Sequence, residues 1–423
     1  MGFQQGLSGL NVSAKNLDVI GNNVANASTV GFKSGQAQFA DVFAASLQGA
    51  GSLPVGLGAK IATVVQQFTQ GNITSTNNPL DIAINGGGFF RMTDTAGTVS
   101  YSRNGQFQFD KNDFVVNSQG LRLMGFAAVN GVVQTGNPVA LQLDRSDINP
   151  QATGTSTTGV SGVQAMLNID SRETVPTVAP FNFANPDTYN QSTSVTVYDS
   201  LGNPHTYSMY FVKNAAANTW DVQATVTNPD GSTNDVTAGL SATQLVFDTG
   251  GVLTTAMPLT QAITDAEYAN PGGVAAGSFP VDFTGTTQYG GIFSVNTLRQ
   301  DGFSLGKLSG FTVGVDGVLI GRYTNGQSRS LGQIVLTSFA NPQGLQAVGN
   351  NQWVETSSSG SELISTPGSD GQHGVLQASA IEDSNVDLTA ELVNMITAQR
   401  VYQANAQTIK TQDQVLQTLV NLR

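Results

Sequence analysis

The chain contains no cysteine, and only two of its 423 residues are histidine. Without cysteine there is neither a disulfide framework nor a thiolate metal site. The two histidines are not neighbours in the sequence, which disfavours a transition-metal site built on imidazoles. We therefore expect no metal and no cofactor. The lack of thiols also suits a chain that travels unfolded through a secretion channel.

Charged residues are scarce as well, at 11% of the chain against about 25% in an average soluble protein. The formal net charge of -12 argues against nucleic acid or an anionic membrane as a partner. Glycine is frequent, with 48 residues, and Ser, Thr, Asn and Gln occupy many polar positions. This composition favours a β-rich protein with many turns, or a surface that packs against neighbouring molecules.

The sequence has no apolar run of about 18 residues, the length that a membrane-spanning helix needs. Its first residues, MGFQQGLSGL, have neither the basic region nor the apolar core of a cleavable signal peptide. We expect no membrane insertion, and if the protein is exported, we expect export without a cleavable signal.

Both ends of the chain carry apolar residues at alternating steps of four and three, the pattern of an amphipathic helix with heptad spacing. The C-terminal pattern predicts one long helix over residues 384–423, and the N-terminal pattern predicts a helix from residue 3 to about 27. Acidic Glu382, Asp383 and Asp387 suit the positive end of the long helix. Two matching stripes at opposite ends of a non-helical chain predict that the termini pair with each other and with other copies. The residues predicted to make these inter-subunit contacts are Leu7, Leu10, Leu17, Val24, Leu388, Leu392, Met395, Tyr402, Ile409, Leu416 and Leu419.

The region between the termini reads as β-strands and turns. SVTVYDSLGNPHTYSMYFV predicts two strands around a turn at residues 201–204, and Asp316-Gly317 and Asn325-Gly326 mark further turns. The fold class predicted is therefore mainly β outer domains, with long terminal α-helices forming an inner coiled-coil-like domain. The chain goes outward and returns. The predicted parts are an inner tube domain (1–30 and 385–423), an extended connector (31–76 and 365–384), a β domain (77–147 and 286–364) and an outer β domain (148–285).

Candidate catalytic motifs have simpler explanations. GFSLG at residues 302–306 matches the Gly-x-Ser-x-Gly elbow of serine hydrolases, with Ser304 as nucleophile and His373 as a conceivable base. The sequence after it predicts a strand and a turn, whereas the elbow requires a helix, so a glycine-flanked turn is favoured. The three glycines at residues 86–88 lack a P-loop lysine and predict a bend between strands. His205, beside Pro204 in a turn, is predicted to be solvated. We predict no catalytic residue.

Two terminal motifs resemble the signatures of the rod and hook family of bacterial flagellar axial proteins. The N-terminal one runs from NNVAN to VGFK, and the C-terminal one is SNVDLTAELVNMITAQRVYQANAQTIKTQDQ. The internal runs VYDSLGNPHTYSMYF, GVLIGRYTNGQSRSLGQIVLTSFANPQGL and DGFSLGKLSGF resemble the hook members of this family. The motif residues are Asn22, Asn23, Asn26, Gly31, Phe32, Lys33, Gln399, Arg400, Tyr402 and Asn405.

The resemblance implies a structural subunit of the flagellar hook, outside the cell, that polymerises into a flexible curved tube and transmits torque from motor to filament. It also implies partners: other copies of the chain, the distal rod protein, the hook cap protein, the hook–filament junction proteins and the flagellar type III export apparatus. A stiff distal rod protein of the same family is the nearest alternative. An exported β-rich hydrolase that uses Ser304 and a filament-type adhesin are more distant ones.

Overall fold

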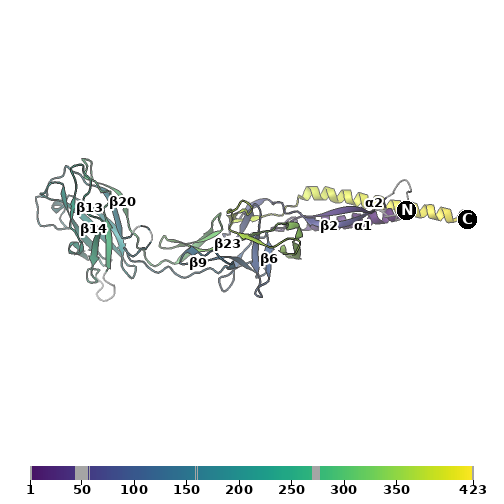
Figure 1. Cartoon of the computed structure of the whole chain (residues 1–423), viewed down its shortest axis with the longest axis horizontal. Helices are drawn as coiled ribbons and strands as arrows, with labels where there is room; N and C mark the ends of the chain where they lie inside the picture. Colours follow the sequence, from purple (N-terminus) through teal and green to yellow (C-terminus); the bar gives the residue numbers. More distant parts are fainter. Residues whose placement is uncertain are drawn as a thin grey trace. The chain divides into compact units, whose positions relative to one another are not determined.

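The computed structural model describes residues 2–42, 56, 58–157, 159, 161–268 and 277–421. The chain forms two compact units (Figure 1). Unit 1 comprises Met1–Arg145, Gly310–Arg322 and Ser328–Arg423, and unit 2 comprises Ser146–Ser309 and Tyr323–Gln327. Both ends of the chain thus belong to one unit, into which the other is inserted. The predicted four-part division is finer than this grouping and stays a prediction.

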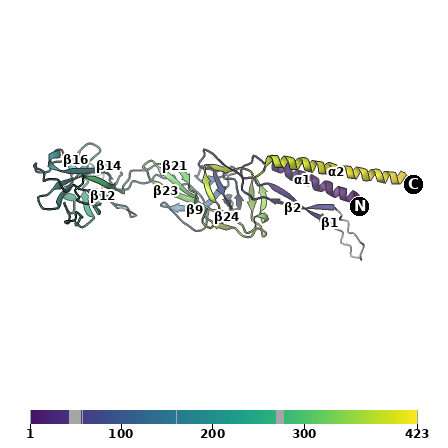
Figure 2. The same cartoon turned by 90° about the horizontal axis from the view of Figure 1, so that it is seen from above.

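The two long helices lie side by side in unit 1, with α1 (Gly2–Ala25) in purple and α2 (Leu388–Asn421) in yellow (Figures 1 and 2). They run antiparallel, because Gly6 lies beside Ile409 while Asn23 contacts Glu391 near the start of α2. Asp387 caps α2, since its Oδ1 accepts the N–H groups of Thr389 and Ala390 at 2.9 and 3.1 Å. Within the described residues, neither helix has the length and apolarity needed to cross a membrane.

A hairpin follows α1 and packs on it (Figure 2). Its strands β1 (Gly35–Val42) and β2 (Gly58–Gln66) pair antiparallel, with Gly35 opposite Gln66 and Val42 opposite Gly58. This hairpin lies within residues 31–76, where the sequence predicts an extended connector and does not predict β1. The residues of β1, GQAQFADV, have low strand propensity, so the strand depends on its partner and on the helix beneath it.

Unit 1 also contains a mixed set of short strands whose main sheet has the order β21-β22-β23-β9-β5-β6-β26-β25. An aromatic cluster of Phe89, Tyr101, Phe339 and Trp353 is buried within it. The predicted turns are confirmed, because Gly317 and Gly326 have φ angles of +80° and +78°. The strands that lie wholly or largely in unit 1 after the hairpin are β3 (Ile73–Ser75), β4 (Ile82–Asn85), β5 (Phe89–Thr93), β6 (Val99–Ser102), β7 (Gln108–Phe109), β8 (Val115–Val116), β9 (Arg122–Val129), β10 (Val132–Val133), β11 (Val139–Ala140), β21 (Leu308–Val313), β22 (Val318–Tyr323), β23 (Ser328–Ile334), β24 (Leu336–Ser338), β25 (Gln346–Gly349), β26 (Gln352–Val354), β27 (Leu363–Ser365), β28 (Val375–Ala378) and β29 (Ala380–Glu382).

Unit 2 consists of two sheets that share one core. One sheet has the order β13-β14-β15-β16 with β17 beside β15, and the other has the order β18-β19-β12-β20. Trp220, Tyr207 and Phe211 from the first sheet and Phe279 from the second are fully buried against each other. The strands are β12 (Val163–Asn168), β13 (Gln191–Tyr198), β14 (Pro204–Lys213), β15 (Thr219–Thr227), β16 (Thr233–Asp235), β17 (Gln244–Val246), β18 (Leu259–Ile263), β19 (Gly277–Asp282) and β20 (Ser294–Arg299).

The turn between β13 and β14 is built around Asp199. Its carboxylate accepts the N–H groups of Leu201 and Asn203 at 2.8 Å each, and this closes the predicted hairpin. The prediction that His205 is solvated is wrong. The imidazole is buried, with Nδ1 2.8 Å from Asn228 Oδ1 and Nε2 3.3 Å from Asp199 Oδ2. It joins the turn to the next strand and is a structural residue.

Candidate assembly surface

Glycines on α1 allow α2 to approach closely. A Cβ placed on Gly6 would lie 3.0 Å from Ile409 Cγ1, and one on Gly9 would lie 2.8 Å from Asn405 Oδ1. Contacts this short would force the helices or the side chains between them to move. In contrast, a Cβ on Gly21 would meet nothing within 4 Å. The two glycines near the N-terminus therefore mark a close approach of the helices.

The predicted assembly residues divide between the helix–helix contact and the free surface. On α1, Leu10, Leu17 and Val24 are half-buried, whereas Leu7 is exposed. On α2, Met395 and Ile409 are half-buried, and Ile409 lies beside Gly6 of α1. The side chain of Leu419 lies outside the described residues. The residues of α2 that are predicted to make contacts but are exposed in the single chain are Leu388, Leu392, Tyr402 and Leu416.

The helical period explains this division. The face of α2 that meets α1 contains Glu391, buried Ala398 and Asn405, which are spaced seven residues apart. At about 100° per residue, Leu388 lies about 60° and Leu392 about 100° around the helix from Glu391, so both are off that face. Leu416 lies beyond the start of α1, because Gly6 is already level with Ile409.

As a result α2 carries many uncovered apolar side chains in the single chain. Its exposed large apolar residues are Leu388, Leu392, Val393, Ile396, Val401, Tyr402, Val415, Leu416 and Val420. Thr397, Thr408, Thr411 and Thr418 donate their hydroxyls to the carbonyls four residues earlier, at 2.8–3.0 Å. Their hydroxyl donors are thus used within the helix. Exposed apolar side chains in this number on one helix mark an interaction site on a soluble protein.

A buried ionic cluster, the Lys33–Arg103–Glu382 junction, ties the bases of both helices to the strands of unit 1. Lys33 Nζ lies 2.6 Å from Glu382 Oε1, and Arg103 NH1 lies 3.3 Å from Glu382 Oε2. All three side chains are at most 4% exposed. Lys33 also donates to Thr69 O at 2.7 Å. Because two cations share one carboxylate, the junction depends on Glu382.

Burial lowers the pKa of Lys33 below its ordinary value of 10.5, and the attraction of Glu382 partly opposes this shift. Burial also lowers the pKa of Arg103, again against the attraction of Glu382. Each cation is thus retained in the interior chiefly through its partner carboxylate.

Two of the N-terminal motif residues, Gly31 and Lys33, contact Glu382 at this junction, whereas Asn23 and Asn26 bond elsewhere. Asn23 is buried and exchanges two 2.8 Å bonds with the backbone of Gly35. Gly31 has a φ of +72°, and a Cβ there would lie 2.7 Å from Asn104 N, so only glycine fits. Phe32 is half-buried, and Lys33 belongs to the junction. Asn26 donates to Asn22 O at 2.9 Å just past the end of α1.

The C-terminal motif residues lie along α2. Gln399, Arg400 and Tyr402 are exposed, and Asn405 is half-buried beside Gly9. Sequence reasoning missed the importance of Glu382, which was assigned to the positive end of α2 together with Asp383 and Asp387. Of these, Asp387 caps the helix, and Glu382 ends strand β29 in the buried cluster. Its separation of 349 residues from Lys33 leaves no local signal for the pairing.

The candidate catalytic residues lie in structural settings. Residues 302–306 form an extended segment, bridged through Phe303 to Gln151 and through Gly306 to Ile148, and not a strand-to-helix elbow. His373 Nδ1 lies 2.7 Å from Asp370 Oδ2 and Nε2 lies 3.1 Å from Leu363 O. The glycines at residues 86–88 connect β4 to β5, as predicted. No group of three His, Asp or Glu side chains in the described part of the chain is placed to bind a metal.

Known protein families match successive parts of the chain. The matching models are described as flagella basal body rod protein (residues 3–33), flagellar hook protein FlgE/F/G D1 domain (83–160), flagellar basal body protein FlaE D2 domain (168–303) and flagellar basal body rod FlgEFG protein C-terminal (377–422). These models describe axial proteins of the flagellar rod and hook.

Individual relatives show which of these axial proteins the chain resembles. The chain is 45% identical to the flagellar hook protein FlgE of Escherichia coli K12 and 44% identical to that of Salmonella typhimurium, over the full length of both proteins in each case. It is 32% identical to the flagellar hook protein FlgE of Borreliella burgdorferi, covering 99% of this chain and 98% of that one. The chain belongs to the flagellar hook protein family.

A solved structure shares the fold. The crystal structure of Helicobacter pylori flagellar hook protein FlgE2 superposes with a TM-score of 0.51 and 11% identity, covering 73% of this chain and all of that one. The predicted fold class, β domains with paired terminal helices, is thereby confirmed.

Proposed function

We propose that this chain is the structural subunit of a bacterial flagellar hook and polymerises through α1 and α2 into a flexible, curved, torque-transmitting tube. The full-length similarity to hook proteins carries this proposal. The chain is 45% identical to the flagellar hook protein FlgE of Escherichia coli K12. The uncovered apolar surface of α2 supports polymerisation, because burying it between subunits yields about 25 cal/mol per Å2.

Assembly and helix ordering are coupled in this proposal. Helices with uncovered apolar stripes gain little stability in a single chain, so α1 and the distal part of α2 become fully ordered only when neighbouring copies cover them. The Lys33–Arg103–Glu382 junction then passes torque from the helices to the strands of unit 1. The outer surfaces, rich in Gly, Ser, Thr and Asn, exchange water-bridged contacts as the tube bends.

The proposal also implies specific partner proteins for the chain. Copies of the chain are exported by the flagellar type III apparatus without a cleavable signal and add beneath the hook cap protein. The tube contacts the distal rod protein at its base and the hook–filament junction proteins at its tip. The proposal gives the chain no catalytic role. The predicted inner tube, connector, β domain and outer β domain become successive layers of the tube wall.

Removal of residues 385–423 tests the role of α2. The purified full-length protein is expected to form curved tubes in concentrated salt, visible by negative-stain electron microscopy, and its far-UV helical signal should rise as it assembles. The truncated chain is expected to remain unassembled while unit 2 keeps its near-UV spectrum. Normal tubes from the truncated chain would refute the role of α2, and straight tubes from the full chain would favour a rod.

A further inference from the structure

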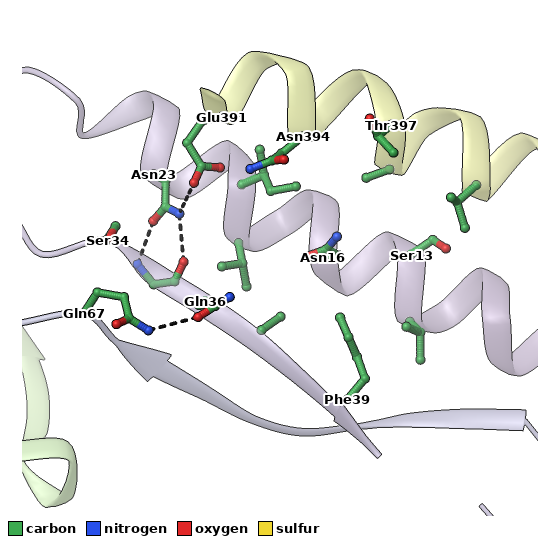
Figure 3. Close-up of a pocket in the computed structure, with 17 residues that line it drawn as sticks. Ser13, Asn16, Asn23, Ser34, Gln36, Phe39, Gln67, Glu391, Asn394 and Thr397 are labelled. Atoms are coloured by element: carbon green, nitrogen blue, oxygen red, sulfur yellow. Dashed lines mark hydrogen bonds between the residues drawn. The ribbon is translucent and has the colours of Figure 1, made fainter. Parts of the chain in front are cut away.

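A groove of about 520 Å3 lies between α1, β1 and the first turns of α2 (Figure 3). Pockets of about 300–1,000 Å3 accommodate molecules larger than a single side chain. One part of the wall is apolar, formed by Val12, Val19, Phe39 and Ala398. Phe39 is 41% exposed, so this wall is incompletely covered within the chain.

The other part of the groove is polar and contains a carboxylate without a cation. Glu391 points from α2 toward Asn23 (Figure 3). Its Oε1 is 3.4 Å from Asn23 Nδ2, which already donates to Gly35 O at 2.8 Å. Its Oε2 is buried and has no hydrogen-bond partner among the described residues. A buried carboxylate oxygen left in this state is unfavourable, and a cation supplied to the groove would relieve it.

The opposite face of α2 carries the cation Arg400 beside exposed apolar side chains. Arg400 is exposed, and no ion pair or hydrogen bond to it is found within the described residues. Val393 and Ile396, one or two turns earlier on the same face, are 58% and 52% exposed. Together these residues form an apolar patch that carries a guanidinium, which matches an apolar groove that carries a carboxylate.

Glu391 and Arg400 cannot pair within one chain. They are nine residues apart, and nine residues turn a helix by about 900°, or two and a half turns, while advancing about 13 Å. The two groups therefore project from opposite faces of α2. A contact between unlike faces of identical chains is head-to-tail, and such contacts propagate into rings or helices instead of stopping at a dimer.

We propose that the groove between α1, β1 and α2 receives the Val393–Ile396–Arg400 face of a second copy of this chain, with Arg400 of that copy paired to Glu391. This inference rests on the proposed polymerisation and assigns a specific contact to it. The occupant is a second copy because the chain itself carries the complementary charge and apolar residues on a face that it leaves uncovered. Lys410 has a different setting, flanked by Gln407 and Gln414 on its own helix.

Charge reversal provides the test. Glu391→Arg, Arg400→Glu and the double variant are compared with wild type for the critical concentration of tube formation, measured by sedimentation and confirmed by electron microscopy. Each single reversal is expected to raise the critical concentration at least tenfold, and the double variant should return to within about threefold of wild type. The matched control is Glu391→Arg with Lys410→Glu, which has the same net charge and should not be rescued.

Folding of each variant is checked by the unfolding midpoint of unit 1, followed through Trp353. If the reversals unfold unit 1, the milder Glu391→Gln and Arg400→Gln replace them in a double-mutant cycle, where the paired loss should be smaller than the sum. The inference is overturned if wild type forms tubes but the double variant is as impaired as the singles, or if the Lys410 control is rescued equally. If wild type forms no tubes, the proposed function itself fails.

Discussion

Replacement of Glu382 by glutamine should be among the most damaging conservative changes in unit 1. The glutamine can keep the bond to the Gly71 N–H, which now reaches Oε1 at 2.9 Å, but it cannot neutralise Lys33 and Arg103. Removal of one partner of a buried ion pair costs about 3–5 kcal/mol. With a urea dependence of about 2 kcal/mol per M, a loss of about 4 kcal/mol lowers the unfolding midpoint by about 2 M.

The two tryptophans make the measurement specific, because Trp353 lies in unit 1 and Trp220 in unit 2. In a Trp220→Phe background, the fluorescence of Trp353 reports urea unfolding of unit 1 alone. Glu355→Gln is the matched control, since Glu355 is exposed and surface changes cost about 0.5 kcal/mol or less. A Glu382→Gln variant no less stable than this control would refute the account of the junction.

The same variant has a predictable pH dependence. Burial lowers the pKa of Lys33 below the value of 10.5 that it regains on unfolding, and removal of Glu382 lowers it further. Between the folded and unfolded pKa values the unfolded state binds more protons, so the stability of unit 1 rises with pH. The deficit of Glu382→Gln relative to wild type should therefore shrink as pH rises from 7 toward 10, and a growing deficit would contradict this assignment.

Three further changes test other contacts. Gly9→Leu should weaken the packing of α1 on α2 and raise the critical concentration for tube formation. In the control Gly21→Leu, nothing lies within 4 Å of the added Cβ. This control should leave assembly intact and stabilise the helix by about 0.5–1 kcal/mol. His205→Ala should destabilise unit 2 by about 2 kcal/mol, because it leaves buried Asn228 Oδ1 without its partner and removes one of the two partners of Asp199 Oδ2. Chemical denaturation followed by the tryptophan of that unit measures the loss. Gly31→Ala should lower the thermal unfolding midpoint of unit 1 by more than Gly97→Ala does. Gly97 also has a positive φ but no neighbours within 4 Å of an added Cβ, so its substitution costs about 1 kcal/mol of stability. Equal losses of stability would show that crowding at Gly31 is unimportant.

The helices and the β-hairpins could be predicted because their signals are local. The apolar spacing in α1 and α2 and the turn at residues 201–204 each depend on residues within a few positions of one another. Strand β1 was missed because its stability comes from a partner strand and a helix. The Lys33–Glu382 pair was missed because it joins residues from opposite ends of the chain, and no local pattern reveals such a pair.

The groove was beyond prediction for a related reason. Heptad spacing indicates that α2 has an apolar stripe, but it does not indicate which part of that stripe α1 covers. That depends on the angular offset between the stripe and the face that meets α1, and on where α1 begins. Glu391 lies in the groove and Arg400 on the free face because nine residues turn the helix by about two and a half turns.

A helical reconstruction of tubes assembled from the full-length protein tests the central claim most directly. The account predicts that α1 and α2 line the lumen, and that Val393, Ile396 and Arg400 of each copy are covered by the α1–β1–α2 groove of a neighbour. A tube held together by unit 2 alone, with α2 still exposed to solvent along its apolar face, would contradict it.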